Sequence, residues 1–117
     1  MPKVSPKFKK LSELGLRPSN EVYTDPIITE ICVDSREIKD GNLFAAMPGS
    51  KFHGIKFVNA AIENRAVAIL TDQEGFDFAK KLLKNIEIPI VVAKDPRILL
   101  SKTVARYFEV QPSTMTA

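Results

Sequence analysis

Apolar residues gather in four short runs along the chain, and each run predicts a β-strand. Residues 27–33 and 89–93 are rich in isoleucine and valine, whose branched side chains favour extended backbone. Residues 42–47 and 66–71 are apolar at nearly every position, which is typical of strands buried on both faces of a sheet.

Elsewhere apolar residues recur three or four positions apart, which predicts helices with one buried face. We expect helices over residues 8–14, 55–64 and 72–84, and a last one that opens at Asp95 and Pro96. The predicted inward residues are Phe8 and Leu11 in the first helix; Phe57, Val58, Ala61 and Ile62 in the second; Phe76, Ala79 and Leu83 in the third; and Leu100, Val104 and Phe108 in the last.

Strands and helices therefore alternate after the first helix, in the order β-β-α-β-α-β-α. This order predicts an α/β fold: a small three-layer domain with a mostly parallel or mixed sheet flanked by helices. We expect an amino-terminal arm and short helix over residues 1–24, the domain itself over 25–112, and the start of a linker over 113–117. Because that last segment is polar and uncapped, we expect the chain to be one domain of a longer protein.

Length and composition narrow the protein class. The 117 residues suit one hydrophobic core, and no apolar run approaches the roughly 18 residues of a membrane span. The basic amino terminus is not followed by the apolar segment of a signal peptide. A single cysteine and a single histidine exclude an internal disulfide and a zinc site built from those residues, and favour a reducing cytoplasm.

The net charge of +3 permits an anionic partner but does not indicate nucleic acid. Basic residues are spread along the chain, with adjacent pairs only at Lys9-Lys10 and Lys80-Lys81, and there is no tryptophan to stack on bases. We therefore expect no nucleic-acid partner and no membrane partner. A small anionic ligand is compatible with the net positive charge.

Motifs for catalysis are missing. The chain contains no glycine-rich phosphate loop, no dinucleotide fingerprint and no nucleophile elbow. Its aspartates at predicted strand ends, Asp34, Asp72 and Asp95, stand apart from one another in the sequence. We therefore expect no catalytic residue and no metal ligand set in this chain.

One candidate binding segment is Val33-Asp34-Ser35-Arg36, at the carboxyl end of the first predicted strand, where open α/β sheets bind ligands. Backbone groups of Val33 could pair with a base edge, the Ser35 hydroxyl could bind polar atoms, and Arg36 could offset an anion. The alternative is a turn in which Asp34 caps backbone N–H groups and pairs with Arg36.

A second candidate segment is the loop from Gly49 to Gly54. Its terminal glycines permit positive φ angles and close backbone approach, Lys51 adds a positive charge, and Phe52 offers a flat face for stacking. The alternative is an ordinary connection between strand and helix, in which His53 caps backbone groups.

Taken together, these segments resemble the amino-terminal domain of the Mur ligases. The resemblance rests on Val33-Asp34-Ser35-Arg36, Gly41-Asn42-Leu43-Phe44-Ala45-Ala46, Gly49, His53-Gly54 and Phe57. Two branches of the family share this pattern: one adds the third residue of the muramoyl peptide, and the other adds the terminal dipeptide. The later segments Asp95-Pro96-Arg97, Ala105-Arg106-Tyr107-Phe108 and Gln111-Pro112-Ser113 resemble the first branch.

The resemblance implies an ATP-dependent ligase of peptidoglycan synthesis that acts on UDP-N-acetylmuramoyl-L-alanyl-D-glutamate and adds meso-diaminopimelate or L-lysine. ATP and Mg²⁺ would be bound by a central domain that this chain lacks, so we expect no cofactor here. The partners would be the nucleotide substrate and the missing central and carboxy-terminal domains. The fragment alone is expected to be inactive.

Carried over residue by residue, the family's uridine contacts fall on Val33 and Ser35, and its loop contacts fall on Ser50, Lys51 and Phe52. Asp34, Arg36, Gly49 and His53 are expected to shape the two segments. Two alternatives stay open: the same domain of the dipeptide-adding ligase, and a free-standing α/β interaction module. A phosphoacceptor receiver is disfavoured, because no second carboxylate accompanies Asp34.

Overall fold

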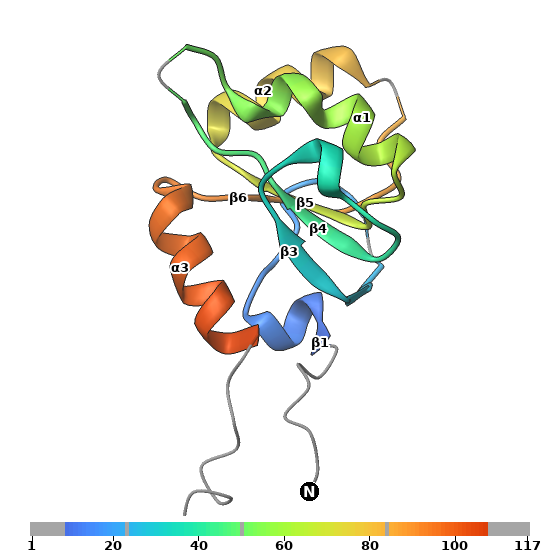
Figure 1. Ribbon diagram of the computed structural model, residues 1–117, viewed down its shortest axis with the longest axis vertical. Coiled ribbons are helices and arrows are strands. Elements are labelled where there is room, and N and C mark those ends of the chain that lie inside the picture. Colours follow the sequence, from blue (N-terminus) through green and yellow to red (C-terminus); the bar gives the residue numbers. More distant parts are fainter. Residues whose placement is uncertain (1–8, 23, 50, 84, 108–117) are drawn as a thin grey trace, which may run out of the picture.

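A computed structural model describes residues 9–22, 24–49, 51–83 and 85–107 of the chain (Figure 1). The strands are β1 (Lys9–Lys10), β2 (Ile27–Ile28), β3 (Glu30–Cys32), β4 (Asn42–Ala45), β5 (Ala68–Thr71) and β6 (Ile90–Val92). The α-helices are α1 (Val58–Glu63), α2 (Gln73–Leu82) and α3 (Pro96–Tyr107), and the 3-10 helices are η1 (Leu11–Leu14), η2 (Ser35–Glu37) and η3 (Gly54–Phe57).

The central sheet has four parallel strands in the order β3-β4-β5-β6, so the predicted α/β fold class is confirmed. Helices α1 and α2 cover one face of this sheet, and α3 with η1 covers the other (Figure 1). The short strands β1 and β2 form a separate antiparallel pair. Since all four strands of the central sheet run in one direction, the loops that follow them leave from the same edge.

Strand β4 shows how the sequence builds both cores. Its residues are buried on both faces, as the continuous apolar run predicts. Leu43 and Ala45 point into the cluster under α3 and η1, whereas Phe44 and the following Ala46 point into the cluster under α1 and α2. This alternation is the two-residue period of an extended strand.

The single strand predicted over residues 27–33 is divided in two. Its first part pairs with β1 and its second part pairs with β4, and Thr29 lies between them. The Thr29 N–H donates to the Gly41 carbonyl at 2.9 Å, and the Asn42 side-chain amide donates to the Thr29 hydroxyl at 3.1 Å. These contacts with the turn before β4 account for the break. The residues predicted as a first helix, 8–14, form β1 and a 3-10 helix instead, and Phe8 lies outside the described residues.

The buried faces predicted for the helix over residues 55–64 and for the last helix are partly wrong. Phe57 is 44% exposed, because residues 54–57 form a 3-10 helix whose faces do not follow the α-helical period. In α3 the buried residues include Thr103 and Tyr107, whereas Val104 is exposed and Phe108 lies outside the described residues. Thr103 is accommodated because its hydroxyl donates to the Leu99 carbonyl at 2.7 Å. Among the described helices, none is long and apolar enough to cross a membrane.

The segment before β2 covers the outer edge of β6. The Ser19 N–H donates to the Ile90 carbonyl at 2.7 Å, and the Asn20 side chain accepts from the Ile90 N–H at 2.8 Å. The same Asn20 amide donates to the Ile88 carbonyl at 3.0 Å. Asn20 therefore replaces a neighbouring strand at a sheet edge that would otherwise present unpaired backbone groups. The domain boundaries proposed from the sequence stay a prediction.

We expect Asn20→Ala to lower the free energy of unfolding by about 1–3 kcal/mol, because the buried Ile90 N–H loses its acceptor. Urea denaturation measures this change as a lower midpoint. Ser19→Ala is the matched control, because Ser19 acts through its backbone N–H, which the substitution keeps. Equal stability of the two variants would contradict the role given to the Asn20 side chain.

Candidate functional site

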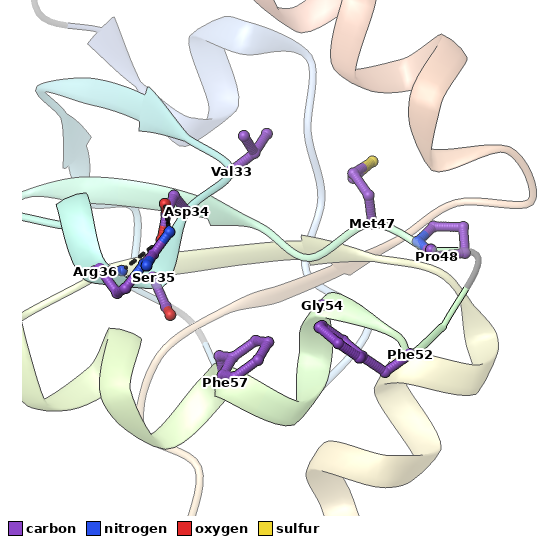
Figure 2. A pocket seen from close by; sticks show the side chains of 10 residues that line it. Val33, Asp34, Ser35, Arg36, Met47, Pro48, Phe52, Gly54 and Phe57 are labelled. Carbon is purple, nitrogen blue, oxygen red and sulfur yellow. Dashed lines mark hydrogen bonds and ion pairs between the residues drawn. The ribbon is translucent and has the colours of Figure 1, made fainter.

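A pocket of about 610 Å³ opens where β3 and β4 end, at the carboxyl edge of the sheet (Figure 2). Its lining joins the two segments singled out in the sequence with residues from the end of β4 and from η3. The lining residues are Val33, Asp34, Ser35, Arg36, Met47, Pro48, Gly49, Phe52, Gly54 and Phe57. The structure thus brings together segments that thirteen or more positions of the chain separate.

The turn after β3 is built by Asp34. Its carboxylate accepts the Arg36 backbone N–H at 2.9 Å and so caps η2. The Arg36 guanidinium donates two hydrogen bonds to the same carboxylate, at 3.1 and 2.9 Å. Hydrogen bonds from the Arg36 side chain, and then from its backbone, lower the pKa of Asp34 below its ordinary value. The turn interpretation of Asp34 and Arg36 is therefore what the structure shows.

Ser35 is the polar residue of this turn that remains available to a ligand. It is 5% exposed, and the Asn64 side chain holds its backbone carbonyl at 3.1 Å. Figure 2 shows its hydroxyl directed into the space between the turn and Phe57. Among the described residues, no hydrogen bond engages that hydroxyl. Val33 borders the pocket beside it with a 60% exposed apolar side chain.

Two aromatic rings form the opposite wall. Phe52 and Phe57 pack edge to face with their ring centres 5.4 Å apart, and both remain nearly half exposed. The Lys56 ammonium lies 5.7 Å from the Phe52 ring centre. Lys51 is exposed beside Phe52 but does not line the pocket, and Ser50 lies outside the described residues.

The glycines of this loop allow other backbone atoms to approach closely. The positive φ angles that the sequence also permits at these two glycines are not adopted. A Cβ on Gly49 would lie 2.6 Å from the Phe52 carbonyl oxygen, and a Cβ on Gly54 would lie 3.1 Å from backbone atoms of Met47. Neither glycine is among the described residues with positive φ. A side chain at Gly49 would therefore push the loop away from the pocket.

Met47 and Pro48 were missed as site residues by the sequence analysis. Met47 is the last residue of the predicted strand over 42–47, and Pro48 lies between that strand and the candidate loop, which begins at Gly49. Their position directly after the end of a parallel strand is the signal that identifies them. Arg97 in the first turn of α3 donates a hydrogen bond to the Pro48 carbonyl, which connects that helix to the pocket.

His53 organises the loop from within. Its side chain is 8% exposed, and its Nδ1 accepts the Ile55 N–H at 3.0 Å, as expected of a cap for η3. Its Nε2 lies 2.8 Å from Asp72 Oδ1, which also accepts the Gly75 N–H at 2.9 Å at the start of α2. With Nδ1 accepting, the proton sits on Nε2, so a neutral imidazole bridges the first turns of η3 and α2.

A metal ion does not fit this cluster, although the ligand atoms of His53, Asp72 and Glu74 lie within 4.8 Å of one another. Both nitrogens of His53 are already engaged in hydrogen bonds, and Asp72 Oδ1 serves two donors. A second hollow of about 410 Å³ lies beside it at the ends of β5 and β6, lined by Asp72, Gln73, Glu74, Val92, Ala93 and Lys94.

We expect the Asp34 carboxyl to titrate below the ordinary aspartate range, and Arg36→Gln to move its pKa part of the way back. A lowered pKa in the folded state means that the stabilisation is present above the ordinary value and is lost as pH falls through the folded value. Carboxyl-detected NMR titration measures both values. Arg65→Gln is the control, because Arg65 pairs with Asp40 elsewhere. An unchanged pKa in Arg36→Gln would contradict the assignment.

A double-mutant cycle tests the bridge between η3 and α2. We expect His53→Ala and Asp72→Ala each to cost about 0.5–2 kcal/mol as lost caps, with a coupling of about 0.5–3 kcal/mol because the two side chains are bonded. His53→Asn keeps an acceptor for the Ile55 N–H but cannot reach Asp72, so it separates the cap from the bridge. Additive effects would show that the bridge contributes nothing.

Comparison with curated proteins finds relatives that share one name. The chain is 35% identical over 109 residues to UDP-N-acetylmuramoyl-L-alanyl-D-glutamate--2,6-diaminopimelate ligase of Caulobacter vibrioides, which covers 93% of this chain and 20% of the relative. It is 38% identical over 84 residues to the enzyme of that name from Streptomyces avermitilis, covering 72% of this chain and 16% of the relative. The chain thus spans about a fifth, or less, of the length of these relatives.

Solved structures agree on the fold. The chain matches a crystal structure of MurF from Acinetobacter baumannii with a TM-score of 0.64 and 19% identity, over 87% of this chain and 21% of that one. A second structure, of UDP-N-acetylmuramoylalanyl-D-glutamyl-2,6-diaminopimelate--D-alanyl-D-alanyl ligase from the same organism, matches with a TM-score of 0.63 and 19% identity, over 89% and 22% of the two chains. At this identity the likeness concerns the fold alone.

The names of the sequence relatives agree with the branch that adds the third residue, as the segments around Asp95 and Ala105 predicted. A family model described as "Mur ligase family, catalytic domain" matches residues 27–108, which is most of the chain. The resemblance seen in the sequence is thereby confirmed, and the chain belongs to the Mur ligase family.

Proposed function

We propose that this domain binds the uridine diphosphate end of UDP-N-acetylmuramoyl-L-alanyl-D-glutamate within an ATP-dependent ligase of peptidoglycan synthesis. The observation that carries the proposal is the pocket at the ends of β3 and β4, which unites both segments of the family pattern. The sequence relatives are named as ligases of this nucleotide substrate with 2,6-diaminopimelate, and we propose the same reaction for the parent protein.

The walls of the pocket suit a flat, uncharged ring. Apolar groups dominate the lining, and Phe52 and Phe57 offer exposed ring surface against which a heterocycle stacks. The Ser35 hydroxyl supplies a hydrogen-bonding group on the opposite side, next to the apolar side chain of Val33. In this proposal Val33 and Ser35 contact the uracil, as the family pattern implies.

The loop after β4 would hold the anionic part. Lys51 is exposed at this loop, and Gly49 brings the backbone to the pocket surface. Ser50, Lys51 and Phe52 are therefore proposed as loop contacts. Asp34, Arg36 and His53 act indirectly, because their side chains hold the turns that form the walls.

The chemistry of the ligase would take place elsewhere in the parent protein. ATP and Mg²⁺ activate a carboxylate in this class of reaction, and we propose that both bind outside this chain. The described residues contribute binding and orientation: they fix one end of a long substrate so that its other end reaches the reacting groups. A cytoplasmic location accompanies this proposal.

An amide NMR titration with uridine, UDP and the UDP-muramoyl dipeptide tests the proposal. We expect shifts centred on the pocket lining, at residues 33–36 and 47–57, with each ligand. Phe52→Ala is expected to weaken binding by about 3- to 10-fold, the effect of one aromatic contact. Phe78→Ala is the matched control, because that exposed ring lies on α2 and does not line the pocket.

Two outcomes would count against the proposal. Shifts centred on the second hollow, at residues 72–74 and 92–94, would place the nucleotide at the ends of β5 and β6 instead. No shifts at millimolar UDP or millimolar UDP-muramoyl dipeptide would show that this pocket is not a uridine site.

A further inference from the structure

The cationic side chains near the pocket differ in how far they are neutralised. Arg36 holds Asp34 with two contacts, at 3.1 and 2.9 Å, and its charge is offset. The Lys56 ammonium lies over the Phe52 ring. Like Lys51 and Lys56, Arg97 has no carboxylate partner among the described residues, and its guanidinium donates to the neutral carbonyl of Pro48, which lines the pocket.

The position of Arg97 is set by two elements. It lies in the first turn of α3, and its hydrogen bond reaches Pro48, which lines the pocket. A guanidinium has five N–H donors, and this contact uses few of them. Its side chain is exposed, so the remaining donors and the full positive charge face solvent beside the pocket. The carboxylate of Asp95 is occupied at the start of the same helix, where it accepts the Ile98 N–H at 3.2 Å.

The pocket has two chemically different ends. Figure 2 shows Asp34, Ser35 and Arg36 at one end and Pro48 at the other, with Phe52 and Phe57 along the side between them. A phosphate placed beside Asp34 would either meet that carboxylate or compete with it for Arg36. An anionic group is therefore favoured at the Pro48 end, where Arg97 lies.

We propose that Arg97 binds the diphosphate of the nucleotide while the base occupies the end near Ser35. Arg97 is then a residue that distinguishes a nucleotide from its nucleoside, a role that rests on the proposed function of the pocket. Its guanidinium matches the geometry of phosphate oxygens, and the contact with Pro48 holds it in place before the ligand arrives.

The experiment compares uridine with UDP on the 117-residue chain by amide NMR titration. In the unmodified chain we expect UDP to bind more tightly than uridine. Arg97→Gln is expected to weaken UDP binding by about 3- to 10-fold, the effect of one charge-assisted contact at an exposed site, and to leave uridine binding unchanged. Lys102→Gln is the matched control: it removes one positive charge from the same helix, away from the pocket lining, and should change neither affinity.

The outcomes separate this proposal from the one on which it rests. If the unmodified chain binds neither uridine nor UDP, the proposed function itself fails. If the unmodified chain binds uridine and UDP with equal affinity, the pocket is still a uridine site, but the proposed role of Arg97 is overturned. If Arg97→Gln weakens uridine and UDP equally, Arg97 only supports the Pro48 loop, and the diphosphate contact is likewise overturned.

Discussion

The register between β3 and β4 is the constraint on which the pocket depends. Ile31 pairs with Leu43 and Cys32 with Phe44, so the two strands end side by side and their loops leave the sheet together. A shift of one residue would exchange the faces of β4 and place Phe44 in the cluster that Leu43 now fills. Since both faces of β4 are buried, no solvent-exposed face could accommodate the side chains that such a shift would displace.

The polar side chains near the pocket largely hold the backbone of its walls. Asp34 caps η2, His53 caps η3, and Asp72 caps α2 while it bonds to His53. The hydrogen-bonding capacity of these side chains is therefore used within the fold. What faces the pocket is largely apolar and aromatic, with the Ser35 hydroxyl available beside it. This division suits a site that binds and orients rather than one that reacts.

Much of this architecture follows from local sequence. The continuous apolar runs predicted β4 and β5, and both candidate segments were found because polar and glycine-containing stretches follow strands. The division of the strand at Thr29 was not predictable, because it is imposed by the turn at Gly41, twelve residues later. The exposure of Phe57 depends on whether residues 54–57 form a 3-10 or an α-helical turn, which apolar spacing alone does not decide. The contact of Arg97 with Pro48 spans 49 positions and required the tertiary structure.

The distribution of charge also favours one orientation of the proposed ligand in the pocket. Asp34 and Arg36 form an ion pair at one end, so that end presents little net charge and suits a neutral ring. At the Pro48 end the positive charge of Arg97 is unopposed among the described residues. In the binding mode that we propose, a ligand with a neutral head and an anionic tail has its tail toward the loop after β4 and the start of α3. The same binding mode has the remainder of a long substrate leave the domain on that side, because reversing the ligand would set its phosphates against the Asp34 carboxylate.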